Sequence, residues 1–314
     1  MSQNYATALI RRSRLIMPAS VRKFVEKAYL RNADAIVLDL EDSVPQAEKT
    51  AARTLVRELI PLAGKGGSDV FVRVNNSAGL LAADIDAAVW PGLTGLVIPK
   101  TETAAEIAAI EAQVARLEQA RGIAAGSIAL SLLIESCKGY LNLREIAAAS
   151  DRVDSLTLGN EDFLWEAGIK DTPATQAALL TPRLQLVLTA RAYGKAPLGL
   201  IGSLANYSDA DAFFASAVLA YQHGFTGASC IHPGNVELLN QAFSPPAAEL
   251  DQAAQVIAAF EAALAAGRAS TKLAGKMIDY VHYEKAKQII ERQQKIDAFE
   301  QKKKTARSAV KTTE

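Results

Sequence analysis

Short apolar runs alternate with helical patterns along the chain between residues 15 and 231. The eight runs span residues 15–17, 35–40, 70–74, 95–98, 128–134, 155–158, 198–201 and 228–231. Short, nearly continuous apolar segments are typical of parallel strands that are buried on both faces. Helical patterns lie between them at residues 20–32, 46–60, 103–121, 175–194 and 208–223. Strands joined by helical crossovers predict an α/β fold, a (β/α)8 TIM barrel.

An open, doubly wound sheet is the alternative architecture. That fold commonly carries a glycine-rich phosphate loop after its first strand, but here the strand continues into Pro18-Ala-Ser20. After the eighth strand the pattern changes at Ser244-Pro-Pro, and long helices are predicted at residues 247–266 and 284–301. We therefore divide the chain into a barrel domain (1–245), a helical lid or oligomerisation arm (246–301) and a disordered basic tail (302–314).

Composition narrows the functional classes. Lys+Arg and Asp+Glu both number 34, which argues against a nucleic-acid or membrane-surface binder. The apolar runs are too short to span a bilayer. The two cysteines, Cys137 and Cys230, are far apart and lack metal-ligand spacing, so we expect a reducing compartment, the cytoplasm.

Polar residues gather where the predicted strands end. They include Asp39, Glu41, Asp42, Arg73, Asn75, Lys100, Glu135, Asp162 and His232. In a barrel the chemistry takes place at the carboxyl ends of the strands, so these residues predict a site at one mouth. Of the three acids after the second strand, we expect Asp39 and Glu41 to face one side and Asp42 the other, with at least one in a capping or ion-pair role.

Glu135 and Asp162 end adjacent predicted strands, so they could share one Mg²⁺ ion. The structural alternative is that they cap helices or pair with Arg73 and Lys100, and spacing alone leaves both open. Arg73 lies inside an apolar strand, where an arginine needs an anion. It either pairs with Glu41 or binds a substrate carboxylate or enolate, and we favour the second because its guanidinium can clamp a carboxylate in two hydrogen bonds.

Several motifs in order resemble the HpcH/HpaI aldolase superfamily, in its branch of citrate lyase β-subunit-like, malyl-CoA and citramalyl-CoA lyases. The most specific is Val37-Leu-Asp-Leu-Glu-Asp-Ser-Val44. The others are Arg14-Leu-Ile-Met-Pro-Ala, Val72-Arg-Val-Asn75, Val97-Ile-Pro-Lys100, Ile134-Glu-Ser136, Gly159-Asn-Glu-Asp162, Ile231-His-Pro233 and Gly275-Lys-Met-Ile-Asp279. The resemblance covers most of the chain, from Arg14 to about Ala286.

The resemblance implies a TIM barrel with Mg²⁺, or Mn²⁺ as an alternative ion, on Glu135 and Asp162. It implies that Arg73 and Glu135 bind substrate and that Arg73 stabilises the enolate oxygen. Asp279 would be the general base or acid on a lid that closes over a neighbouring subunit's site, so homotrimers or homohexamers are expected. Arg14 and Lys23 are the candidates for the phosphates of coenzyme A.

The implied reaction cleaves or forms a carbon–carbon bond in a 3-hydroxyacyl-CoA thioester such as malyl-, methylmalyl- or citramalyl-CoA, between a 2-oxo acid and an acyl-CoA. The alternatives are a citrate lyase β subunit that acts on a carrier-protein thioester, a CoA-independent 4-hydroxy-2-oxo acid aldolase, and a non-enzymatic scaffold. The chain departs from the family pattern at Ala228, where a lysine is usual, at Val281, where a proline is frequent, and in the stretch 196–203, which lacks an acid. The acyl group therefore stays unassigned.

Overall fold

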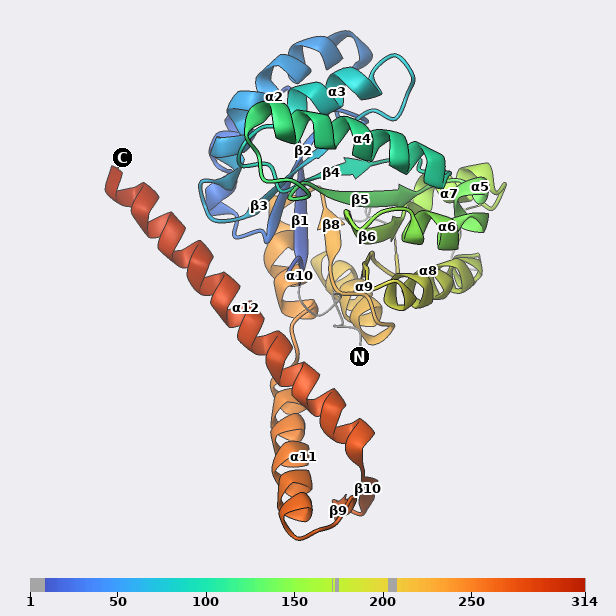
Figure 1. The fold of residues 1–314 in the computed structure, drawn as a ribbon, viewed down its shortest axis with the longest axis vertical. Coiled ribbons are helices and arrows are strands. Elements are labelled where there is room, and N and C mark those ends of the chain that lie inside the picture. Colours follow the sequence, from blue (N-terminus) through green and yellow to red (C-terminus); the bar gives the residue numbers. More distant parts are fainter. Residues whose placement is uncertain (1–8, 171, 173–174, 203–207, 314) are drawn as a thin grey trace. The chain divides into compact units, whose positions relative to one another are not determined.

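The computed structural model describes residues 9–170, 172, 175–202 and 208–313 (Figure 1). The first eight residues of the predicted barrel domain, Ser203 and Glu314 therefore lie outside the described part. Two compact units make up the chain. The first comprises Met1–Phe243 with Lys303–Glu314, and the second comprises Ser244–Lys302.

Eight parallel strands form the sheet of the first unit, in the order β7-β6-β5-β4-β3-β2-β1-β8 (Figure 1). Their bounds are β1 Ser13–Pro18, β2 Ala35–Asp39, β3 Asp69–Arg73, β4 Gly95–Ile98, β5 Ala129–Ile134, β6 Val153–Leu158, β7 Ala196–Leu198 and β8 Ala228–Cys230. Within the described residues, β7 and β8 meet through one isolated parallel bridge, between Leu198 and Gly227. The sheet is thus a nearly closed barrel, which confirms the predicted TIM-barrel class.

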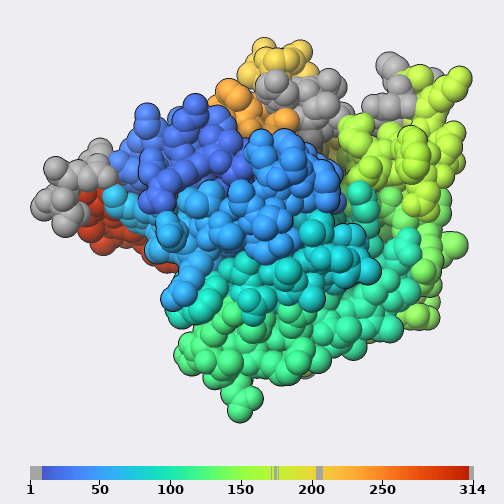
Figure 2. All heavy atoms as spheres, turned by 90° about the horizontal axis from the view of Figure 1, so that it is seen from above, coloured from blue at the N-terminus to red at the C-terminus, as the bar shows by residue number. Residues whose placement is uncertain are grey.

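Helices cover the outside of the barrel. They are α1 Arg22–Glu26, α2 Lys49–Gly64, α3 Leu81–Ala88, α4 Ala104–Arg121, α5 Cys137–Leu141, α6 Leu143–Ala148, α7 Asn160–Glu166, α8 Leu180–Ala192, α9 Ala210–Gln222 and α10 Val236–Ala242. Short 3-10 turns are η2 Ala28–Leu30, η3 Gln46–Glu48, η4 Gln176–Leu179 and η5 Pro233–Asn235. Figure 2 shows α2, α3 and α4, blue to green, side by side on one face.

The strands bury apolar side chains on both faces, because successive residues of a strand alternate between the inside and the outside of the barrel. The inner cluster consists of Ala35, Val37, Phe71 and Val97, with Ile16 and Leu133 packed against it. The outer cluster fills the space between strands and helices. Gly95 is required by this packing, because a Cβ there would lie 2.6 Å from Cε1 of Phe71 and 2.7 Å from the carbonyl oxygen of Ala129.

The second unit is built from α11 Ala247–Ala265, a hairpin of β9 Thr271–Leu273 and β10 Lys276–Ile278, and the first part of α12 Tyr280–Thr313. The hairpin occupies the connector predicted between two long helices. Its turn places Ala274 and Gly275 at φ +48° and +79°, a backbone region that glycine tolerates best. The rings of Phe260 and Tyr283 stack with centroids 5.0 Å apart and hold α11 against α12.

The end of the chain differs from the predicted disordered tail, because α12 continues to Thr313. Lys303 is fully buried in the first unit, where its Nζ lies 2.7 Å from Oδ1 of Asp34 and 2.9 Å from the carbonyl oxygen of Asn32. Asp34 also accepts hydrogen bonds from Arg12. The buried ion pair of Lys303 could not be predicted from the basic composition of this segment. Among the described helices, none combines the length and the apolarity that crossing a membrane requires.

Candidate active site

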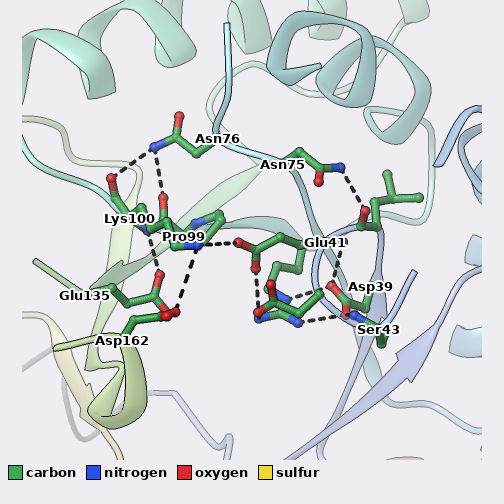
Figure 3. Close-up of polar contacts among 12 residues, drawn as sticks. Asp39, Glu41, Ser43, Asn75, Asn76, Pro99, Lys100, Glu135 and Asp162 are labelled. Carbon is green, nitrogen blue, oxygen red and sulfur yellow. Dashed lines mark hydrogen bonds and ion pairs between the residues drawn. The ribbon is translucent and has the colours of Figure 1, made fainter. Parts of the chain in front are cut away.

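The predicted polar residues converge at the carboxyl ends of the strands. A cavity of about 210 Å³ opens there. Its lining includes Arg73, Glu135 and Asp162 at the mouth, and Leu133, Thr157 and Arg14 further inside the barrel. The structure therefore brings together three of the residues expected to bind metal or substrate. Figure 3 shows the polar contacts of this region.

Arg73, at the end of β3, is held by the aspartate that ends β2. Its Nε and Nη2 each donate to one oxygen of Asp39, both at 2.7 Å, in a two-pronged ion pair. Asp39 is fully buried and also accepts from the backbone N and the Oγ of Ser43. Burial alone would raise the pKa of Asp39, but the hydrogen bonds and charge of Arg73 outweigh it and hold this pKa below its usual value. Asp39 thus takes the ion-pair role expected for at least one acid of this strand end.

The remaining end of the Arg73 guanidinium faces two more acids. Nη1 lies 2.9 Å from Oε2 of Glu41, an ion pair without hydrogen-bond geometry, and 3.3 Å from Oδ2 of Asp42. Asp42 was expected on the opposite side, but β2 ends at Asp39 and the chain turns, so all three acids reach Arg73. Burial lowers the pKa of Arg73, but these carboxylates raise it by more. Arg73 is therefore always charged.

Glu41 differs from Asp39 although both contact the same arginine. Burial raises the pKa of Glu41 to about 7, and the charges of Asp42 and Glu135 add to the increase, while Arg73 and Lys100 oppose it. Lys49 holds the segment that follows β2, since its Nζ donates to the carbonyl oxygens of Leu40 and Glu41 at 3.0 and 2.7 Å. The mouth therefore holds more negative charge than its cations neutralise.

Glu135 directly follows β5 and Asp162 lies in the first turn of α7, and Figure 3 shows the two carboxylates side by side. Glu135 is 6% exposed and accepts one hydrogen bond, from the backbone N of Lys100 at 2.8 Å. The side-chain Nζ of Lys100 lies 4.0 Å from Asp162. Burial raises the pKa of Glu135, and the charge of Asp162 contributes to the increase. Pairing with lysine, the structural alternative, is therefore present but leaves these carboxylates short of positive charge.

Two backbone features position Glu135. Gly159 touches it so closely that a Cβ there would lie 2.4 Å from Cγ and 2.5 Å from Oε1 of Glu135. Lys100 has a φ of +49°, a conformation that is uncommon for residues other than glycine and tends to occur at functional sites. In this conformation the backbone N of Lys100 points to Glu135. Both features keep the carboxylate at the pocket wall.

The donor set fits a magnesium ion. Mg²⁺ is commonly bound by one or two protein carboxylates, with waters and substrate oxygens completing its shell. Glu135 and Asp162 supply two carboxylates at a mouth that is locally negative. Within the described part of the chain, no group of three or more His, Cys, Asp or Glu residues is arranged to hold a metal. The two carboxylates would therefore need water or substrate oxygens as further ligands.

Asp279 lies in the second unit, between β10 and α12. It caps α12, since its Oδ1 accepts from the backbone N of Val281 and of His282 at 3.1 and 3.2 Å. The Nδ1 of His282 lies 2.5 Å from the same oxygen. The hydrogen bond with the His282 side chain is the largest influence and lowers the pKa of Asp279. Its role on a lid stays a prediction.

The two candidates for coenzyme A phosphates lie in different surroundings. Lys23 is exposed on α1, with its Nζ 5.6 Å from the ring centre of Phe24. Arg14 is only 2% exposed and lies inside the barrel, where its Nη1 donates to Oγ of Ser131. The structure thus gives Arg14 a setting different from the expected phosphate contact, because its strand position turns the side chain inward.

Sequence reasoning missed Thr157 and the positioning role of Gly159. Thr157 lies on β6 and lines the pocket, with its buried Oγ1 without a hydrogen-bond partner. The available signal was a polar residue within an apolar run, the same signal that singled out Arg73. Gly159 belongs to a motif that was noticed for its acids, and its contact with Glu135 joins two strands that only the fold brings together.

Comparisons with known proteins identify the family of the chain. Residues 12–233 match the sequence profile of the HpcH/HpaI aldolase/citrate lyase family. The chain is 34% identical over 271 residues to the citrate lyase subunit beta of Leuconostoc mesenteroides, covering 86% of this chain and 89% of that protein. It is 33% identical over 293 residues to a (3S)-malyl-CoA thioesterase of Cereibacter sphaeroides, covering 92% of this chain and 96% of the relative.

Solved structures agree as well. The CitE protein of Mycobacterium tuberculosis, in complex with magnesium, acetoacetate and coenzyme A, superposes with a TM-score of 0.69 at 26% identity, covering 90% of this chain and 97% of that one. A citrate lyase beta subunit from the same organism, complexed with oxaloacetate and magnesium, gives a TM-score of 0.59 at 26% identity over 76% and 99% of the two chains. From the profile, the relatives and the fold together, the chain belongs to the HpcH/HpaI aldolase/citrate lyase family.

Proposed function

We propose that this protein is a Mg²⁺-dependent carbon–carbon lyase that cleaves or forms a 3-hydroxyacyl-CoA thioester, such as malyl-, methylmalyl- or citramalyl-CoA. The products of cleavage are a 2-oxo acid and an acyl-CoA. The observation that carries the proposal is the pair of carboxylates, Glu135 and Asp162, beside Arg73 in the mouth of the barrel. The magnesium and coenzyme A named with the Mycobacterium tuberculosis protein support it.

Glu135 and Asp162 would hold the metal. A bound Mg²⁺ acts as a Lewis acid toward the oxygens of the 2-oxo acid or of the hydroxyl group. Glu135 is kept at the wall by the backbone N of Lys100 and by the absence of a side chain at Gly159. The raised pKa of Glu135 reflects a buried carboxylate whose surroundings supply too little positive charge, which a divalent cation would provide.

Arg73 would stabilise the enolate oxygen or hold the substrate carboxylate. Its two hydrogen bonds to Asp39 fix the plane of the guanidinium, so the group meets the substrate without rearranging. A guanidinium has five N–H donors, and Asp39 takes only two of them, while Arg73 also lines the pocket. The contacts with Glu41 and Asp42 are compatible with a substrate anion as a further partner of the same cation.

Asp279 would move the proton as general base or acid. Its hydrogen bonds with His282 favour the ionised form, which is the form that a base needs. In this proposal the second unit acts as a lid over the site of a neighbouring subunit, in a homotrimer or homohexamer. Lid closure would keep water away from the enolate.

Lys23 is the proposed contact for a phosphate of coenzyme A, because it is exposed on the helix that follows β1. The chain has Ala228 where the family usually has lysine, so its remaining contacts with coenzyme A differ from the family pattern. The acyl group stays open. A cytoplasmic location also stays a prediction.

A second candidate function is the β subunit of a citrate lyase complex, which acts on a carrier-protein thioester. Relatives from Leuconostoc mesenteroides and Haemophilus influenzae carry this name, at 34% and 33% identity. A CoA-independent 4-hydroxy-2-oxo acid aldolase could use the same two carboxylates and Arg73, but it would not need the second unit. Copurification of a small carrier protein separates the β subunit from the stand-alone lyase, and a CoA-binding assay separates both from the aldolase.

The test is the release of acetyl-CoA or propionyl-CoA and a 2-oxo acid from malyl-, methylmalyl- and citramalyl-CoA. We expect cleavage of at least one thioester with Mg²⁺ and none with EDTA. The Glu135→Ala variant should lose the activity while keeping its unfolding midpoint in EDTA. If folded protein cleaves none of these thioesters in Mg²⁺, a stand-alone lyase for malyl-, methylmalyl- or citramalyl-CoA is excluded.

A further inference from the structure

The inner end of the pocket holds a buried cation that does not serve the metal site. Arg14 lies on β1, is 2% exposed and lines the pocket. Its Nη1 donates to Oγ of Ser131 at 2.8 Å, and its guanidinium lies 5.1 Å from the ring centre of Phe71. Its Nε is buried without a hydrogen-bond partner. Among the described residues, no carboxylate lies within 4.0 Å of this guanidinium, the distance of an ion pair.

The neighbouring Arg11 is also buried, but carboxylates pair with its charge. Arg11 forms ion pairs with Asp69, at 3.2 Å, and with Asp154. Its guanidinium lies 4.5 Å from the ring centre of Phe71 on β3. Burial lowers the pKa of Arg14 to about 10, Asp154 opposes this at longer range, and Arg11 adds to it. Arg14 is therefore charged at neutral pH but lacks the direct anion that Arg11 has.

A second polar group that lines the same pocket also lacks a partner. Thr157 lines the cavity from β6, and its Oγ1 is buried without a hydrogen bond. The wall between β7 and β8 is built from small residues, Gly199, Ala228 and Ser229, which leave room inside the barrel. A guanidinium and a hydroxyl that face one cavity form a donor set for an oxyanion.

We propose that Arg14 and Thr157 form a carboxylate-binding subsite, which selects substrates whose 2-oxo acid carries a second carboxylate at the far end of a short chain. The inference rests on the proposed function, because the first carboxylate and the oxo group would bind the Mg²⁺ that Glu135 and Asp162 would hold. Ser131, the partner of Arg14, precedes Glu135 by four residues on β5, which corresponds to about 13 Å along the strand. A 2-oxo acid with a second carboxylate extends further from the mouth toward Arg14 than glyoxylate or pyruvate does.

The test compares two acids that differ only in the terminal carboxylate, 2-oxoglutarate and 2-oxobutyrate, by isothermal titration calorimetry in Mg²⁺. We expect the protein to bind 2-oxoglutarate at least about tenfold more tightly, as charge-assisted hydrogen bonds in a buried site allow. Arg14→Met should abolish this preference and leave the affinity for 2-oxobutyrate within about twofold. Thr157→Val should reduce the preference by about threefold.

Arg116→Met is the matched control, because Arg116 is exposed on α4. It should keep the preference. If Arg14→Met does not fold, Arg14→Lys, which keeps the charge but removes Nε, replaces it and should lower the preference. Equal binding of the two acids by the unmodified protein, or an unchanged preference in the Arg14 variants, would overturn the subsite.

The outcomes also separate this inference from the proposed function. Binding of both acids that is lost in EDTA and in Glu135→Gln, but without a preference for 2-oxoglutarate, leaves the lyase standing and removes the subsite. If neither acid binds in a Mg²⁺-dependent manner, the proposed function itself fails, and the subsite fails with it.

Discussion

Two buried glutamates of the barrel unit have opposite electrostatic surroundings. Glu118 on α4 is 1% exposed and accepts four hydrogen bonds, from the backbone N of Gly126 and of Ile128 and from two nitrogens of Arg152. Burial alone would raise the pKa of Glu118, but these donors lower it to about 2. This carboxylate is a satisfied structural anion that holds α4 against the strands.

Glu135 is almost as buried, yet its pKa is raised. The described residues give it one hydrogen bond, from Lys100, and place Asp162 beside it. Both side chains are nearly inaccessible to solvent, but Glu118 has four donors and a counter-ion, whereas Glu135 has one donor and a neighbouring acid. A buried carboxylate with few donors retains oxygen lone pairs for a ligand, as the proposed metal-binding role of Glu135 requires.

The largest expected effect separates the two glutamates by activity. Glu135→Gln should lower Mg²⁺-dependent thioester cleavage by about a thousandfold, because it removes a charged metal ligand. Glu118→Gln should leave the rate within about twofold at a temperature where the variant is folded, since Glu118 lies outside the pocket. The measurement is kcat at saturating Mg²⁺ and substrate. Comparable losses in both variants would contradict the comparison.

The second effect separates them by stability. Glu118→Gln should lower the free energy of unfolding by about 3 kcal/mol, because the buried Arg152 guanidinium then keeps only Glu111, at 3.4 Å, as a counter-ion. In EDTA, Glu135→Gln should be as stable as the unmodified protein or more so, since it removes a poorly compensated charge. Urea unfolding followed by circular dichroism measures both. A large loss in Glu135→Gln would assign that residue a structural role.

A smaller effect tests how Glu135 is positioned. In Gly159→Ala the new Cβ would lie 2.4 Å from Cγ of Glu135 and push the carboxylate from its place. We expect Mg²⁺ affinity, measured by calorimetry, to fall by about 10- to 100-fold, as for other changes next to metal ligands. Gly79→Ala is the control, because a Cβ at Gly79 meets nothing within 4 Å. Unchanged affinity in Gly159→Ala would show that Glu135 tolerates displacement.

The sequence predicted the strands well because a strand that is buried on both faces is a local signal. All eight apolar runs overlap an observed strand, and the weakest match is the seventh, predicted at residues 198–201 and observed at Ala196–Leu198. There Pro197 lies in a three-residue strand that forms a ladder with β6 and a single bridge, from Leu198 to Gly227, on its other side, so the apolar run extends past the ladder. The convergence of Arg73, Glu135 and Asp162 followed from the barrel rule alone.

Other features depend on contacts between distant segments. Arg14 was expected near the mouth as a candidate for the phosphates of coenzyme A, but the direction of its side chain depends on strand register, with Arg14 beside Ala35 and Ser229. Lys303 was assigned to a disordered tail, and its buried partner Asp34 lies far away in sequence. The three-acid arrangement around Arg73 required a turn after Asp39 that alternation did not predict.

The two regions should also respond to pH in opposite directions. Glu41 shares the acidic mouth with Glu135, and its pKa is raised from 4.5 to about 7, so between these values the folded protein keeps a proton that the unfolded chain has lost. Stability should therefore fall as pH rises from 4.5 to 7, by at most about 1.4 kcal/mol per pH unit. The pKa of Glu118 is lowered from 4.5 to about 2, so its contribution is present above 4.5 and is lost as pH falls toward 2.

In metal-free protein, the change of stability in each of these two pH ranges can be assigned to one residue. Urea midpoints from about pH 3 to about pH 8 should show a maximum, since other groups add their own slopes to these two. Glu41→Gln should reduce the fall of the urea midpoint between pH 4.5 and 7 and leave its fall below pH 4.5 unchanged. Glu118→Gln should have the opposite effects. If Glu41→Gln leaves the fall of the urea midpoint between pH 4.5 and 7 unchanged, the excess of negative charge at the mouth does not oppose folding. The contrast between the two regions would then rest on hydrogen bonding alone.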